Sequence, residues 1–191
     1  MPFTHQNSII NKIYKTLLIR IIMKELFEKL QKISIDDNSA NNFILLDTCF
    51  FINTFEHQKE QHLKDLMSTN RIAMTSFNVN EFLLKEHVVD ERVRENVRRF
   101  LKKNPAMTII DVNINPGDRY GEKAFVNSID SGLLQDVPDA SDAVLIAAAI
   151  KTSSTVLTKD KHHLFTTKLE NYLQKYDIKV FKEYHDLTEN N

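Results

Sequence analysis

Short apolar runs that alternate with longer stretches of helical periodicity constrain this chain most. Residues 43–47 (FILLD) form the first such run, and four more follow at residues 71–75, 106–112, 155–158 and 178–181. Continuous apolar runs of this length are typical of parallel strands that are buried on both faces. Because helical stretches separate the runs, the pattern predicts an α/β fold, a three-layer α/β/α sandwich around a central, mainly parallel sheet.

The helical stretches lie between these runs. We expect helical structure up to about residue 68 and then at residues 77–89, 90–103, 120–134, 142–150 and 163–173. The stretch at 142–150 is rich in alanine, which allows close packing against a sheet. Ser141 is the expected N-cap of that helix.

The composition excludes several classes of site. The chain has only three glycines, Gly117, Gly121 and Gly132, and they form neither a dinucleotide fingerprint nor a phosphate-binding loop. Cys49 is the single cysteine, so no intramolecular disulfide can form, and a reducing, cytoplasmic compartment is the simplest interpretation. Neither Cys49 nor the histidines have zinc-site spacing. The chemistry must therefore come mostly from carboxylates.

The N-terminal segment differs from the rest of the chain. Residues 1–24 contain no acid, and their lysines and arginine interrupt an amphipathic helical pattern, so no membrane span is expected. Three interpretations stay open: a docking helix, a translated extension upstream of a start at Met23, and a membrane-surface or transit helix. The polar residues 34–42 indicate a linker. We therefore expect residues 1–42 to be a helical extension with its linker, dispensable for a folded domain over residues 43–191.

Four acids stand at the ends of predicted elements. Asp47 closes the first strand, Glu81 lies in the helix after the second, Asp142 opens the alanine-rich helix, and Asp160 follows the fourth strand. Each could by itself be a turn residue, a helix cap or a solvated side chain. Ligands of parallel α/β folds bind at the carboxyl ends of the strands, so the four acids are expected to converge there.

Converging carboxylates repel one another unless a cation neutralises them. Mg²⁺ and Mn²⁺ are the expected cations, because they prefer such oxygen ligands. Asp139, three residues before Asp142, could join as a further ligand. A phosphatase on the same architecture would need an acid two residues after Asp47, where this chain has Cys49.

Three segments resemble the PIN domain, a family of metal-dependent nucleases. They are FILLDTCFFI (43–52), TSFNVNEFLL (75–84) and VPDASDAVLIAAAIKTSSTVLTKDKHHL (137–164), and the resemblance covers about residues 43–182. It implies that Asp47, Glu81, Asp142 and Asp160 are catalytic and bind Mg²⁺ or Mn²⁺, with Asp139 as an additional family acid and Thr48 and Thr158 as supporting hydroxyls. The family commonly has Asn or Ser where this chain has Cys49.

The resemblance also implies an activity and partners. It predicts a metal-dependent endoribonuclease that hydrolyses RNA to 5′-phosphate and 3′-hydroxyl products, as a toxin of a toxin–antitoxin pair or as an RNA-processing enzyme. A PIN-like module without activity that acts as a binding scaffold is the alternative. An antitoxin protein and a second copy of the chain stay open as partners.

Basic residues gather in the predicted helix 90–103. Six cations oppose a single acid between residues 92 and 103 and lie opposite an apolar stripe, and two lysines flank Asp160. Such a face could bind RNA phosphates or could be an ordinary solvated face. The candidate substrate-binding residues are Arg92, Arg98, Arg99, Lys102, Lys159 and Lys161.

Overall fold

The protein folds around one parallel sheet. A computed structural model describes residues 20–160, 164 and 166–189. Its six strands are parallel and lie in the order β1-β4-β3-β2-β5-β6. Their bounds are β1 (Gln31–Ser34), β2 (Ile44–Leu46), β3 (Ile72–Thr75), β4 (Thr108–Asp111), β5 (Thr155–Leu157) and β6 (Val180–Phe181). The five predicted strands are confirmed, and β1 is an addition.

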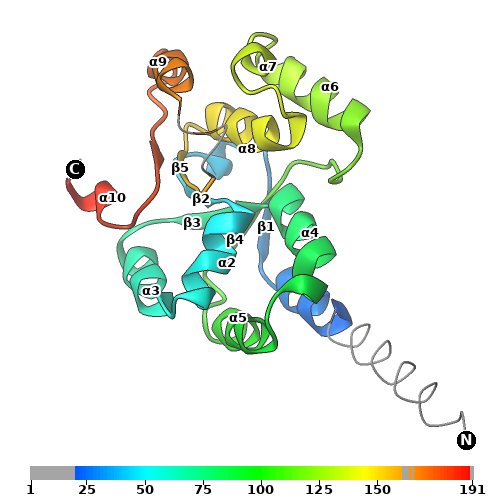
Figure 1. Ribbon diagram of the computed structural model, residues 1–191, viewed down its shortest axis with the longest axis vertical. Coiled ribbons are helices and arrows are strands. Elements are labelled where there is room, and N and C mark those ends of the chain that lie inside the picture. Colours follow the sequence, from blue (N-terminus) through cyan, green and yellow to red (C-terminus); the bar gives the residue numbers. More distant parts are fainter. Residues whose placement is uncertain (1–19, 161–163, 165, 190–191) are drawn as a thin grey trace, which may run out of the picture.

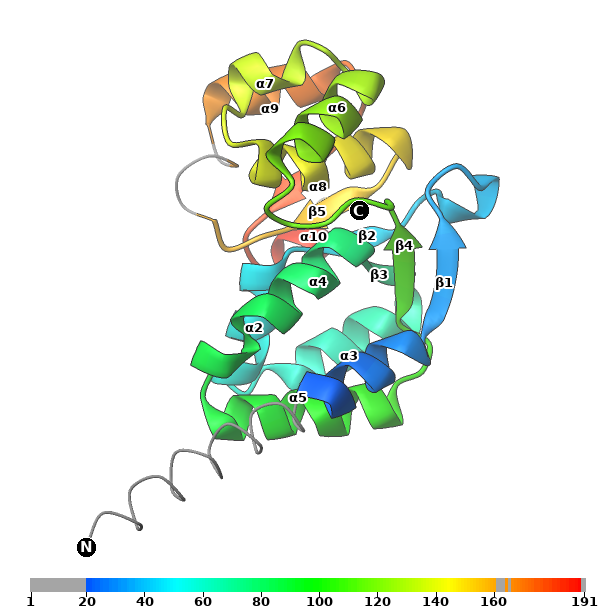
Figure 2. The same ribbon diagram turned by 90° about the vertical axis from the view of Figure 1, so that its right-hand side faces the viewer.

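Helices cover both faces of the sheet (Figures 1 and 2). One layer consists of α2 (Thr48–Glu56), α3 (Glu60–Thr69), α4 (Ser76–Lys85) and α5 (Glu91–Lys103). The other consists of α6 (Arg119–Ile129), α7 (Leu133–Asp136), α8 (Ala140–Lys151) and α9 (Thr167–Gln174). The structure also contains two short 3₁₀ turns, η1 (Asn38–Ala40) and η2 (Glu86–Val88), the short helix α10 (Asp186–Glu189), and a helical segment at residues 20–28. The predicted three-layer α/β/α sandwich is confirmed.

The central strands β2 to β5 are mostly apolar because each faces two cores. In β2, Ile44 and Leu46 belong to the core beneath α2–α5, whereas Leu45 belongs to the core beneath α6–α9. Adjacent side chains of a strand point to opposite faces, so a sheet covered on both sides requires apolar residues at every position. This alternation explains the continuous runs in the sequence.

Some predicted helices are divided in the structure. The stretch before residue 68 forms α2 and α3, separated where Gln58 adopts a left-handed backbone with φ of 56°. The stretch at 120–134 likewise forms α6 and α7. The start of the stretch at 163–173 lies partly outside the described residues. No helix of the described ranges is long and apolar enough to cross a membrane.

Residues 20–42 belong to the fold, although residues 1–42 were expected to be a separable extension with its linker. Residues 20–28 are helical, and Met23 and Phe27 are buried in the core beneath α2–α5. Strand β1 then pairs in parallel with β4 at the edge of the sheet (Figure 2). Only Ile33 of β1 is buried, so this edge strand lacks the continuous apolar run of the other strands. Residues 1–19 lie outside the described part of the chain.

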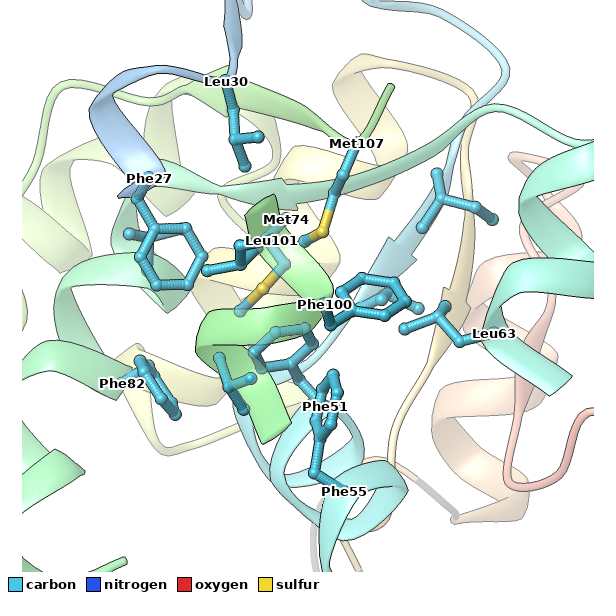
Figure 3. Close-up of a cluster of buried hydrophobic side chains, with 14 of the residues drawn as sticks. Phe27, Leu30, Phe51, Phe55, Leu63, Met74, Phe82, Phe100, Leu101 and Met107 are labelled. Atoms are coloured by element: carbon cyan, nitrogen blue, oxygen red, sulfur yellow. The ribbon is translucent and has the colours of Figure 1, made fainter. Parts of the chain in front are cut away.

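An aromatic cluster connects this segment to the helices that carry the acids (Figure 3). Phe27 packs against Phe51 of α2 and Phe82 of α4, with ring centroids 6.3 and 5.8 Å away. Phe51 and Phe82 also meet edge to face at 5.7 Å. Such tilted and edge-to-face ring pairs stabilise a core beyond their buried area. The cluster therefore holds α2, which starts beside Asp47, against α4, which carries Glu81.

Candidate active site

A cavity of about 260 Å³ lies where β2 and β5 end and α4 and α8 approach them. The four acids singled out in the sequence all line it, and they come from four different parts of the chain. The complete lining consists of Asp47, Thr48, Cys49, Ile52, Asn78, Glu81, Lys85, Ser141, Asp142, Leu145, Asp160 and Leu164. The carboxyl ends of parallel strands are where ligands bind in such folds.

Asp47 stands between β2 and α2, but its side chain does not cap that helix. Instead, its Oδ2 accepts hydrogen bonds from Thr158 Oγ1 at 2.6 Å and from Cys49 Sγ at 2.7 Å. Asn78 Nδ2 donates to Oδ1 at 3.3 Å. These donors hold the carboxylate in the cavity, so the interpretation of Asp47 as a helix cap does not apply.

Burial raises the pKa of Asp47, and the negative charge of Glu81 adds to this rise. The hydrogen bonds from Cys49 and Thr158 lower the pKa and partly oppose burial. A buried carboxylate beside a second acid is costly in its charged form unless a cation is near. The surroundings of Asp47 therefore favour binding of a cation.

Glu81 lies on α4, one turn before Lys85. Lys85 Nζ donates to Glu81 Oε1 at 2.6 Å, and Thr48 Oγ1 donates to Oε2 at 2.6 Å. Burial by itself lowers the pKa of Lys85, but its hydrogen bond to Glu81 and the charges of the surrounding acids raise it above its ordinary value. Both oxygens of Glu81 are thus engaged by neighbouring side chains.

The start of α8 differs from its prediction. Asp139 is the N-cap, and its side chain accepts from the Ser141 backbone N–H at 2.9 Å, whereas Ser141 was the expected cap. The Ser141 hydroxyl instead donates to Glu122 Oε2 at 3.1 Å. Asp139 is exposed and does not line the cavity, whereas Asp142, in the first turn, does. An acid at the cap satisfies the free backbone donors of the helix.

Asp160 enters the cavity from the loop after β5. Its Oδ2 accepts from the Leu164 backbone N–H at 3.0 Å, and its own N–H donates to Thr158 Oγ1 at 3.0 Å. The side chain of Lys159 forms an ion pair with Glu183 and is not part of the cavity lining. Lys161 lies outside the described residues.

The donor set fits a hard divalent cation in its chemistry, because four carboxylates of one cavity offer the oxygen ligands that Mg²⁺ and Mn²⁺ prefer. Over the residues that the structure describes, no three His, Cys, Asp or Glu side chains form a group that could hold a metal ion. The acids therefore surround the cavity without forming a finished cluster.

The basic helix α5 lies apart from this cavity, and none of its residues line it. It occupies the end of its layer that is distant from α8 (Figure 2). Arg92, Arg99 and Lys102 are exposed, whereas Arg98 is partly buried and pairs with Glu95 at 2.5 Å. Arg92, Arg99 and Lys102 are therefore exposed cations on a surface apart from the cavity, and their role in binding RNA stays a prediction.

Two polar residues of the cavity, Asn78 and Lys85, were not singled out from the sequence. Both follow from the helical period, since Asn78 lies three residues before Glu81 and Lys85 four residues after it, which places all three on one face of α4. Their signal was present, but an amide and a lysine on a helix are too common to be singled out alone.

Comparison with known families agrees with this arrangement. The family model of the PIN domain matches residues 44–167, which include all four acids of the cavity. No match is found among curated proteins. Since the matched residues make up more than half of the chain and carry strands β2 to β5 with the acidic cavity, this protein belongs to the PIN-domain family, whose members are generally nucleases.

Proposed function

We propose that the protein is a Mg²⁺- or Mn²⁺-dependent endoribonuclease. The observation that carries the proposal is the convergence of four carboxylates, from four parts of a PIN-family chain, on one cavity. Asp47 and Asp142 would bind the metal directly, and Glu81 and Asp160 would complete or orient its ligands. A metal bound there would activate a water molecule and stabilise the charge that develops during phosphodiester hydrolysis.

The neighbours of these acids have positioning roles in this proposal. Thr158, Cys49 and Asn78 fix the orientation of the Asp47 carboxylate through three hydrogen bonds. Thr48 does the same for Glu81. Fixed carboxylates need no reorganisation when a ligand arrives, which favours both metal binding and catalysis. Asp139 acts as a helix cap that holds the start of α8, and so Asp142, in place.

RNA is the proposed substrate, and exposed cations are the expected contacts for its backbone. Arg92, Arg99 and Lys102 on α5 offer such contacts outside the cavity. Phosphate contacts of this kind contribute affinity without sequence specificity.

The test is cleavage of an end-labelled single-stranded RNA by the full chain with Mg²⁺ or Mn²⁺ and with a chelator. Cleavage should require the metal and be lost in Asp47→Asn and Asp142→Asn, because each substitution removes a proposed metal ligand. The matched control is Asp177→Asn, since Asp177 is exposed, and asparagine suits its left-handed backbone with φ of 55°. Near-normal cleavage by either cavity variant would refute the proposed site.

One observation favours a second candidate, an inactive PIN-like module that binds RNA or protein. Within the described residues, the acids form no three-membered group for a metal. This candidate predicts RNA binding without metal-dependent cleavage in the same assay. If cleavage occurs, a toxin role further predicts that expression arrests growth and that Asp47→Asn relieves the arrest, whereas an RNA-processing role predicts no arrest.

A further inference from the structure

The cavity contains its own cation. Among its described lining residues, Lys85 is the single lysine, arginine or histidine, and it stands with four carboxylates. Its Nζ lies 2.6 Å from Glu81 Oε1, while Thr48 occupies the other oxygen of Glu81. The ammonium therefore neutralises one of the acids that the proposed function assigns to the metal.

The geometry of α4 favours this pair. Glu81 precedes Lys85 by four residues, which is the more stabilising order for an ion pair on a helix. The two side chains differ in exposure, since 22% of Glu81 but 58% of Lys85 is accessible to solvent. Lysine has a flexible stem and a strongly hydrated head, so Lys85 can leave Glu81 for water at little cost.

We propose that Lys85 is a built-in competitor of the divalent cation. In the cation-free protein the Lys85 ammonium holds Glu81, and a divalent cation must displace it before Glu81 can take part in binding. The inference rests on the proposed function, because it concerns the same acids. It accounts for an acidic cavity whose carboxylates do not form a closed metal group, since one of them is engaged by an internal cation.

The competition has a consequence for affinity. An exposed ion pair on a helix contributes little, and its loss corresponds to a change of about fivefold in a binding constant at most. Removing the Lys85 charge should therefore tighten binding of the divalent cation by up to this factor. A residue that only supported the fold, or that helped to hold the metal, would weaken binding when replaced.

The experiment measures Mn²⁺ binding by the full chain without RNA, using electron paramagnetic resonance of the free ion. Lys85→Met keeps the aliphatic stem and removes the charge, and its dissociation constant for Mn²⁺ should fall by up to about fivefold. Lys85→Arg retains a cation and should bind Mn²⁺ like the unaltered protein. Lys64→Met, on the exposed surface of α3, controls for the change in net charge. Circular dichroism checks that each variant is folded.

Asp47→Asn, measured in parallel, separates two kinds of failure. If Asp47→Asn weakens Mn²⁺ binding while Lys85→Met leaves it unchanged or weaker, the competition is refuted and the proposed site stands. If Asp47→Asn binds Mn²⁺ as the unaltered protein does, the proposed site itself fails, and the inference fails with it. Tighter binding in Lys85→Met, with no change in Lys64→Met and Lys85→Arg, supports the competition.

Discussion

Phe27→Ala tests whether the segment before residue 43 is a structural part of the domain. Phe27 is 4% exposed and packs against Phe51 and Phe82 in the aromatic cluster (Figure 3). Truncating a buried phenylalanine to alanine costs about 3–5 kcal/mol, through lost transfer free energy and the cavity left behind. The two ring contacts, at roughly 0.5–1.5 kcal/mol each, are part of that total.

The expected loss of unfolding free energy is large enough to measure without difficulty. A change of 1 kcal/mol moves the melting temperature of a chain of this size by about 2–4 °C, so Phe27→Ala should lower it by roughly 10 °C. Urea denaturation followed by circular dichroism measures the free energy of unfolding directly. The slope of the free energy against urea concentration should stay the same, because the surface exposed on unfolding changes little.

Ile21→Ala is the matched control, because Ile21 lies in the same helical segment but is 54% exposed. A surface substitution of this kind should change the stability by no more than about 0.5 kcal/mol. If Phe27→Ala were no more destabilising than Ile21→Ala, the segment would not contribute to the core. Phe27 would then be dispensable, as the separable extension predicted from the sequence requires.

Three further predictions concern the surface, the cavity and a charged cluster. Replacing Arg99 and Lys102 together by Gln should weaken RNA binding. The slope of the logarithm of the binding constant against the logarithm of the salt concentration should fall by about 1.4, because two phosphate contacts are lost. An unchanged slope would show that these side chains are only solvated. Cys49→Ser should keep RNA cleavage, because a hydroxyl can replace the thiol as donor to Asp47, whereas Cys49→Ala should slow cleavage; equal rates in the two variants would contradict a positioning role. Burial opposes ionisation of Asp130, but the hydrogen bonds that its carboxylate accepts hold its pKa below the ordinary range. Its charge therefore stabilises the fold above about pH 4, so Asp130→Asn should cost about 1–2 kcal/mol at pH 7. That difference should begin to shrink as the pH falls below about 4 and be lost only when the pH falls through the lowered pKa of folded Asp130. A difference that did not shrink with falling pH in urea denaturation would contradict this cause.

The architecture could be predicted from the sequence because buried strands and helices require apolar residues at characteristic spacings. Strands covered on both faces require apolar residues at every position, and the runs at residues 43–47 and 155–158 mark β2 and β5. Strand β1 could not be predicted in this way, because an edge strand with one buried residue has no continuous apolar run. Its membership of the sheet depends on pairing with β4, which lies more than 70 residues away.

The position of the acids at strand ends could also be predicted, because the carboxyl ends of parallel strands lie at the same edge of a sheet. Asp47 and Asp160 follow strands that are neighbours in the sheet, and both line the cavity. The sequence did not show which contacts each predicted site residue makes. Asp139 caps helix α8, and Lys159 forms an ion pair with Glu183 instead of lining the cavity.

Only the tertiary structure decided which side chains engage the acids. Thr158 and Asp47 are 111 residues apart, yet they form a 2.6 Å hydrogen bond because β2 and β5 are adjacent. Hydrogen bonds depend on tenths of an ångström between atoms of different elements, and such distances leave no periodic pattern in a sequence. The local sequence permitted the pair of Lys85 with Glu81, but the packing of α4 against α2 and β3 placed that pair in the cavity that the other carboxylates line.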